Sequence, residues 1–163
     1  MMTPDFEQTI QHNVNILHKL CRVYSNDETE YQELFQDMLI QIWRALPNFR
    51  GEAQISTWLY RVCINTALGY RTRAKKTAGK FVPLEENLPA AFSFGLDGKD
   101  EQSNRLLKAV RELKPVDRAI VSLYLDEKSY EETAQILGIT KTNVATRLMR
   151  LKKQLLEKLS AYE

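Results

Sequence analysis

The stretch Ser129–Lys153, SYEETAQILGITKTNVATRLMRLKK, carries the local signals of two helices joined by a tight turn. Ser129 and Glu132 have the spacing of a capping box, which predicts the start of the first helix. Gly138 stands where a left-handed C-terminal residue is favoured. Thr140 can cap the second helix, whose apolar positions recur at helical spacing: Val144, Leu148, Leu151 and Leu155.

The face of the second helix opposite this apolar stripe is polar and basic. Its residues are Lys141, Thr142, Asn143, Thr146, Arg147 and Arg150. No acidic residue lies between Glu132 and Glu157, and the small side chain of Ala134 lets the two helices cross closely. These features favour a DNA-reading helix-turn-helix, and the alternative is an ordinary packed helical hairpin.

Charge is unevenly distributed along the 163 residues, although the net charge is only +2. Residues 53–84 hold six basic side chains and no acidic one, and residues 135–163 hold six basic and two acidic ones. The segment 85–102 between them holds five acidic residues and one lysine. Two basic segments separated by an acidic one indicate two separate contacts with a polyanion.

Helical periodicity runs through most of the chain and no strand pattern interrupts it, so we expect an all-α fold. Helices are expected at residues 5–24 and 29–46, and a third is capped by Ser56 or Thr57 and ends near residue 73. After a segment rich in Pro and Gly, helices follow at 104–113 and 116–125, with Asp117 near the positive end of the latter. We therefore expect two small helical domains, 5–76 and 104–160, joined by a flexible linker at 77–103.

Several classes of protein are disfavoured by what the sequence lacks. It contains no nucleophile–base pair, phosphate-binding loop or clustered metal ligands, so we expect no enzyme activity, no cofactor and no metal. The N-terminus has no apolar core typical of a signal peptide, and no apolar run reaches the length of a membrane span. Cys21 and Cys63 are expected to be buried thiols in a reducing cytoplasm.

Two further stretches carry a family resemblance together with Ser129–Lys153. They are ELFQDMLIQIW at Glu33–Trp43 and TWLYRVCINTALGYRTRAKK at Thr57–Lys76. In this order the three resemble the bacterial sigma-70 family, and most of all its small extracytoplasmic-function group. The resemblance implies a sigma factor that binds core RNA polymerase and directs promoter-specific transcription initiation.

The Glu33–Trp43 helix resembles the family segment that docks on the clamp coiled coil of the largest polymerase subunit. The resemblance assigns this contact to Glu33, Leu34, Gln36, Asp37, Ile40 and Trp43. An edge of acidic and amide side chains beside apolar residues suits a basic partner helix. Ile40 and Trp43 fit the core of the bundle equally well.

The Thr57–Lys76 segment resembles the part of the family that recognises and melts the −10 promoter element. It offers hydrogen-bonding, stacking and cationic side chains, as exposed bases and their backbone require: Tyr60, Arg61, Asn65, Tyr70, Arg71 and Arg73. Trp58 falls in the apolar series and is expected to be structural. Gly69 replaces an aspartate that many relatives carry at this position.

The basic face at Lys141–Arg150 resembles the family's recognition helix for the −35 element, where Asn and Arg side chains can read base edges. The resemblance also implies contact between the last helix and the polymerase flap, and an anti-sigma protein as a further partner. Two alternatives stay open. One is a duplex-binding helix-turn-helix regulator with a separate sensing domain, and the other is a helical protein-interaction adaptor.

Overall fold

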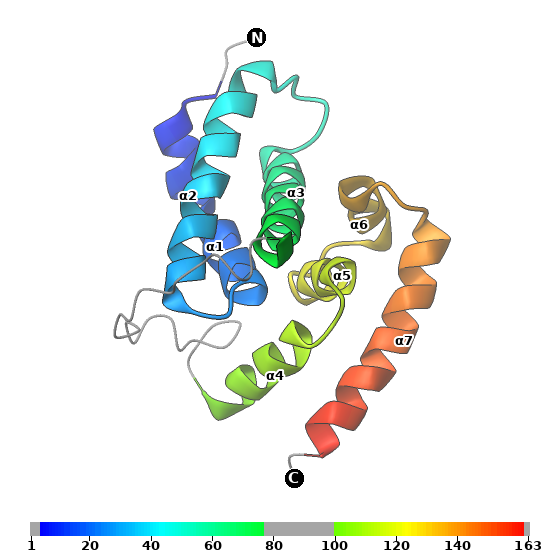
Figure 1. Cartoon of the computed structure of the whole chain (residues 1–163). Coiled ribbons are helices and arrows are strands. Elements are labelled where there is room, and N and C mark those ends of the chain that lie inside the picture. The colour runs from blue at the N-terminus through cyan, green and yellow to red at the C-terminus, as the bar shows by residue number, and fades with distance from the viewer. Residues whose placement is uncertain (1–3, 77–99, 162–163) are drawn as a thin grey trace. The chain divides into compact units, whose positions relative to one another are not determined.

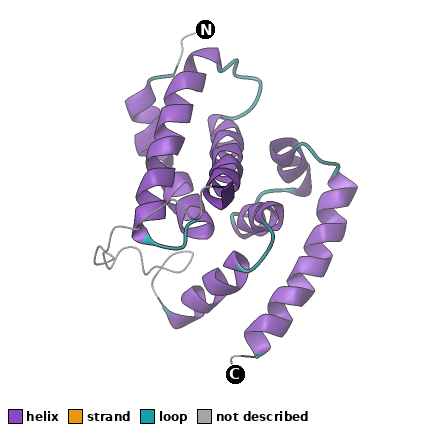
Figure 2. Cartoon of the chain, in the orientation of Figure 1, coloured by secondary structure: helices purple, strands orange, loops and turns teal. Residues whose placement is uncertain are grey.

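The computed structural model describes residues 4–76 and 100–161, and for residues 73–76 only the backbone. All regular structure in these ranges is helical, which confirms the all-α prediction (Figures 1 and 2). The described residues form two compact units, one on either side of residues 77–99. Most of the expected linker lies outside the described residues. Within the described ranges, no helix combines the length and the apolarity that a membrane crossing requires.

The first unit contains three α-helices and a short 3-10 helix. They are α1 (Phe6–Tyr24), α2 (Glu28–Ala45), η1 (Leu46–Asn48) and α3 (Ile55–Lys76). The carboxylate of Asp5 caps α1 by accepting from the backbone N–H of Gln8 at 3.0 Å. Asp27 caps α2 in the same way, accepting from the N–H of Glu30 at 2.8 Å. Local capping chemistry therefore fixes where both helices begin.

The three α-helices of this unit pack against one another around a core of fully buried side chains. The core includes Leu17, Leu20, Leu34, Met38, Ile42, Leu59 and Ile64. Cys21 and Cys63 are free and buried within it, and the Sγ of Cys21 lies 3.7 Å from the Sδ of Met38. Burial raises the pKa of Cys63 to about 12 and that of Cys21 further. Both thiols are therefore protonated near neutral pH and serve as packing groups.

The second unit contains four helices. They are α4 (Glu101–Arg111), α5 (Pro115–Leu125), α6 (Tyr130–Leu137) and α7 (Lys141–Ser160). The long α7 packs against each of the other three. Buried side chains from all four helices meet in this core, among them Val110, Ile120, Leu123, Ile136, Leu148 and Leu151. The apolar stripe of α7 thus holds the unit together.

Several helix boundaries differ from the expectations by a few residues, and local chemistry explains two of the helix starts. The fourth helix begins at Glu101 rather than residue 104, because the carboxylate of Asp100 accepts from the N–H of Ser103 at 2.7 Å. The third begins at Ile55, since the N–H of Trp58 already donates to the carbonyl of Gln54 at 3.1 Å. These shifts move no predicted site residue out of its helix.

Two glycines provide a matched stability test. Gly69 is exposed within α3, and a Cβ there meets no atom within 4 Å, so Gly69→Ala should raise the free energy of unfolding by ~0.5–1 kcal/mol. Gly138 has φ +71°, where alanine is strained, so Gly138→Ala should lower it by ~1–2 kcal/mol. Thermal unfolding of the full chain measures both. A destabilising Gly69→Ala would show that this position needs glycine.

Candidate nucleic-acid interface

The turn between α6 and α7 has the geometry that its sequence predicts. The N–H of Glu132 donates to the Oγ of Ser129 at 3.0 Å, and the N–H of Ser129 donates to Oε1 of Glu132 at 3.5 Å. Gly138 is left-handed, and its N–H donates to the carbonyl of Ala134 at 2.8 Å. Thr140 then caps α7 through the N–H of Asn143 at 3.0 Å. The predicted helix-turn-helix is therefore present.

The buried and exposed faces of α7 separate as expected. The apolar side chains of its inward stripe are each at most 8% exposed: Val144, Leu148, Leu151 and Leu155. On the opposite face, the structure exposes Lys141, Thr142, Thr146 and Arg150, and leaves Asn143 and Arg147 half-buried. The Nζ of Lys141 lies 3.2 Å from the Oε1 of Glu131, in an ion pair that is open to solvent on both sides. This basic face, Lys141–Arg150, is therefore the candidate surface for a DNA groove.

Arg147 is held by two acceptors of the same unit. Its Nε donates to Oδ1 of Asn143 at 3.0 Å, one turn earlier on α7. Its Nη1 lies 3.5 Å from Oδ1 of Asp117, a buried carboxylate in the first turn of α5. Sequence reasoning missed this contact with Asp117. The two residues lie thirty positions apart, and no local spacing links them.

The exposed face of α3 carries part of the predicted −10 set. Arg61, Asn65 and Gly69 are exposed at successive turns, and Arg71 is half-buried. The side chain of Arg73 lies outside the described residues. Gly69, which has no side chain, stands one turn beyond Asn65 on this face. The polar group at its centre is the Asn65 amide, which can both donate to and accept from a base edge.

The prediction that Tyr60 and Tyr70 offer stacking surfaces is corrected by their burial. Tyr60 is 3% exposed and Tyr70 is 8% exposed. They belong to the inward series that also includes Ile64 and Ala67, so helical geometry turns both rings toward the core. The Tyr70 hydroxyl donates to Oε2 of Glu33 on α2 at 2.9 Å. Burial, followed by this bond, raises the pKa of Tyr70.

Two apolar residues of α2 lie at the surface of the first unit rather than in its core. Trp43 is 64% exposed and Ile40 is 46% exposed, which removes the alternative that they belong to the core. Gln36 is exposed one turn before Ile40, and Asp37 is half-buried. Leu34 is fully buried, so its predicted contact with a partner is corrected to a role in the core.

Trp58 behaves as the structural residue that its apolar series predicts. It is partly buried, and its ring packs at a tilt against Phe49, with centroids 5.3 Å apart. This contact joins the start of α3 to the turn that precedes it.

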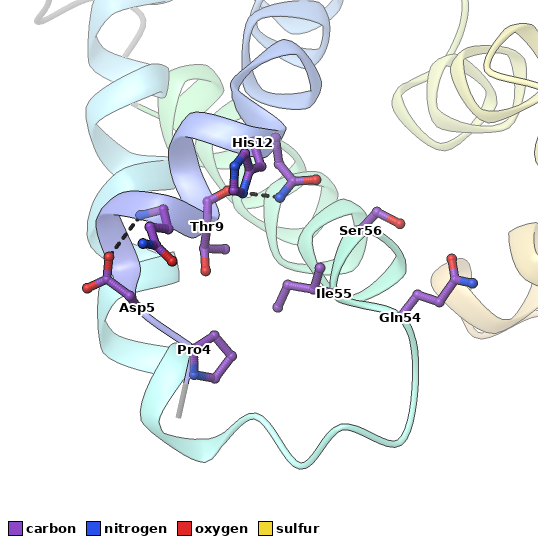
Figure 3. A pocket seen from close by; sticks show the side chains of 9 residues that line it. Pro4, Asp5, Thr9, His12, Gln54, Ile55 and Ser56 are labelled. Atoms are coloured by element: carbon purple, nitrogen blue, oxygen red, sulfur yellow. Dashed lines mark hydrogen bonds between the residues drawn. The ribbon is translucent and has the colours of Figure 1, made fainter. Parts of the chain in front are cut away.

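An open pocket lies between the N-terminal ends of α1 and α3, and no predicted site residue lines it. Figure 3 shows Thr9 and His12 on one side and Gln54, Ile55 and Ser56 on the other. The amide of Asn13 in this pocket donates to the carbonyl of Thr9 at 2.8 Å. Within the described ranges, no group of three His, Cys, Asp or Glu side chains is arranged to hold a metal ion.

Comparison with protein families finds two matches in the expected order. Residues 9–77 match the model for sigma-70 region 2, and residues 103–155 match the model for sigma-70 region 4. Together these matches span more than half of the chain. The first unit therefore coincides with region 2, and the second with region 4.

Curated relatives extend the similarity over most of the chain. The ECF RNA polymerase sigma factor SigM of Mycobacterium tuberculosis is 29% identical over 152 residues, covering 92% of this chain and 74% of that protein. The RNA polymerase sigma factor YlaC of Bacillus subtilis is 29% identical over 152 residues, covering 89% and 86%. The fold resembles the sigma factor RpoE of Bartonella quintana, solved with the anti-sigma factor NepR. That match has a TM-score of 0.73, 24% identity, and coverage of 96% of this chain and 97% of that one.

Tyr70 allows a test of its corrected role. Tyr70→Phe should lower the free energy of unfolding by ~1 kcal/mol, because it removes the hydrogen bond to Glu33 and keeps the ring. Binding to a single-stranded −10 oligonucleotide should be unchanged under conditions where both proteins are folded. Urea unfolding and fluorescence anisotropy measure the two quantities. If stability were unchanged and oligonucleotide binding weakened, the Tyr70 hydroxyl would instead belong to the DNA-binding surface.

Proposed function

Because the chain belongs to the sigma-70 family and is a sigma factor that directs promoter-specific transcription, we propose that its two units divide the promoter between them. The first unit binds core RNA polymerase and the −10 element, and the second binds the −35 element. The observation that carries this proposal is the pair of exposed polar faces, on α3 and α7, one in each unit. Each face lies in the segment that matches a different sigma-70 region.

The polymerase-binding surface of this proposal lies on α2. Ile40 and Trp43 are apolar, exposed and one turn apart, which is typical of the anchors at the centre of an interface. Gln36 and Asp37 supply the polar edge that suits a basic coiled coil of the clamp. Glu33 contributes indirectly, since its carboxylate holds Tyr70 of α3. Leu34 supports this surface from the core beneath it.

Promoter opening in this proposal depends on α3. Duplex opening is unfavourable, so a protein that opens DNA without ATP must bind the exposed bases better than the duplex. Asn65 supplies the hydrogen-bonding edge for a base, and Arg61 supplies a cation for the backbone one turn earlier. Arg71 and Arg73 extend the cationic set toward the end of the helix.

Duplex recognition in this proposal depends on the face of α7. Asn143, Thr146, Arg147 and Arg150 would enter the major groove of the −35 element, and Lys141 and Thr142 would hold phosphates at the start of the helix. Farther along α7, beyond the Lys141–Arg150 face, the apolar side chain of Leu156 is 67% exposed. Leu156 is the contact that we propose for the polymerase flap.

The remaining features of the proposal follow from the same surfaces. The chain acts by binding, as an initiation factor in the cytoplasm, and polymerase performs the chemistry. We also propose an anti-sigma protein as a partner, because the similar sigma factor RpoE was solved with its anti-sigma factor NepR. Such a partner would compete with polymerase for the exposed apolar residues of α2 and α7.

Trp43 gives a sharp test of polymerase binding. Trp43→Ala should weaken binding to core polymerase by ~2 kcal/mol, because it removes an exposed aromatic anchor, while thermal stability changes little. Gln41→Ala, exposed one position off this face, is the matched control and should bind as the wild type does. Titration of labelled core polymerase measures affinity, and run-off transcription measures initiation. Equal affinities for both variants would exclude this surface.

Arg61 and Asn65 separate backbone binding from base recognition. Arg61→Ala should weaken binding to all −10 oligonucleotides alike and reduce the salt slope by about one. Asn65→Ala should cost ~1–3 kcal/mol for the preferred sequence only, and leave the salt slope unchanged. Fluorescence anisotropy on matched and scrambled single strands, at several salt concentrations, measures both effects. A sequence-independent loss in Asn65→Ala would contradict its assignment as a base reader.

A further inference from the structure

The contact between α5 and α7 includes a buried carboxylate, that of Asp117, in addition to the apolar side chains that pack the two helices together. Asp117 is 5% exposed and lies in the first turn of α5, beside Pro115 at the helix start. A buried carboxylate is costly unless charge and hydrogen bonds compensate it. The Nη1 of Arg147, on the neighbouring helix, lies 3.5 Å from its Oδ1. Asp117 therefore joins the scaffold of the unit directly to its candidate DNA-binding face.

A second acceptor, the side-chain oxygen of Asn143, also restrains the guanidinium of Arg147. Oδ1 of Asn143 takes the Nε hydrogen at 3.0 Å, and Oδ1 of Asp117 takes one hydrogen of Nη1. Both hydrogens of Nη2 and one of Nη1 stay available for an external acceptor. An arginine side chain is long and has many rotamers, and acceptors on two different helices restrict it to few of them.

We propose that Asp117 is a positioning residue that, together with Asn143, presents Arg147 to a single base pair. This inference rests on the proposed function, in which α7 reads duplex DNA. A restrained guanidinium with a free donor edge suits the two acceptors O6 and N7 of guanine in the major groove. An unrestrained arginine at this position would contact phosphates as readily as bases, and phosphates carry no sequence information.

A purely structural role for Asp117 predicts a different outcome. An acidic residue in the first turn of a helix stabilises that helix through its dipole, whichever residue stands at position 147. Loss of this effect would lower stability and weaken binding to every promoter equally. A positioning role would instead change the preference for one base pair, and only while Arg147 is present.

The experiment uses the full chain assembled with core polymerase, on promoters whose −35 element is randomised, with transcripts sequenced to give a preference at each position. Asp117→Asn should reduce the preference for guanine about tenfold at the one position where Arg147→Ala abolishes it. The double variant should match Arg147→Ala. Glu112→Gln is the control: it removes one carboxylate from the same unit at the Lys158 ion pair and should preserve the profile.

Asn143→Ala provides a second variant that leaves the buried carboxylate in place. It should reduce the guanine preference at the same position, whether or not it also affects another position that Asn143 itself reads. Uniform loss across all sequences in Asp117→Asn, or an undiminished guanine preference at the Arg147 position in that variant, would overturn the positioning role of Asp117. A wild-type protein with no preference anywhere in the −35 element would instead overturn the proposed function of the second unit.

Discussion

Burial of the apolar stripe of α7 is the interaction on which the second unit depends. Val144, Leu148, Leu151 and Leu155 enter a core formed with α4, α5 and α6. Because side chains on one helix have fixed angular relations, burying this stripe also fixes where the opposite face points. The rigid turn at Gly138 and the cap at Thr140 set where that face begins. The core contacts of this unit and the face that we propose for DNA thus lie on opposite sides of one helix.

In the first unit, the packed seam between α2 and α3 has the comparable role, because it fixes the direction of the exposed face of each helix. The core of the unit includes the small side chain of Ala67 on α3, and the contact between Cys21 of α1 and Met38 of α2. The hydrogen bond from the Tyr70 hydroxyl to Glu33 joins α3 to α2 across the same seam. The face that we propose for polymerase on α2 and the face that we propose for bases on α3 therefore lie on two helices that pack against each other. A change that loosens the seam would disturb both.

Features encoded by neighbouring residues could be predicted from the sequence, and features encoded by tertiary contacts could not. The capping box at Ser129, the turn at Gly138 and the stripe of α7 are local signals, and each is present. Tyr60 and Tyr70 are buried where the sequence predicts exposed stacking surfaces, because tyrosine suits both core and interface, and only packing decides between them. The orientation of Arg147 by Asp117 spans separate helices, and no periodicity records it.

The unequal settings of the two tryptophans give the chain an intrinsic optical signal. The sequence contains only Trp43 and Trp58, both in the first unit. Trp58 is packed against Phe49, whereas the indole of Trp43 is largely in water. An indole in water emits at longer wavelength than one in an apolar setting. A macromolecule that covers Trp43 on α2 would therefore shift the tryptophan fluorescence of the unlabelled protein, and this shift would report binding at α2.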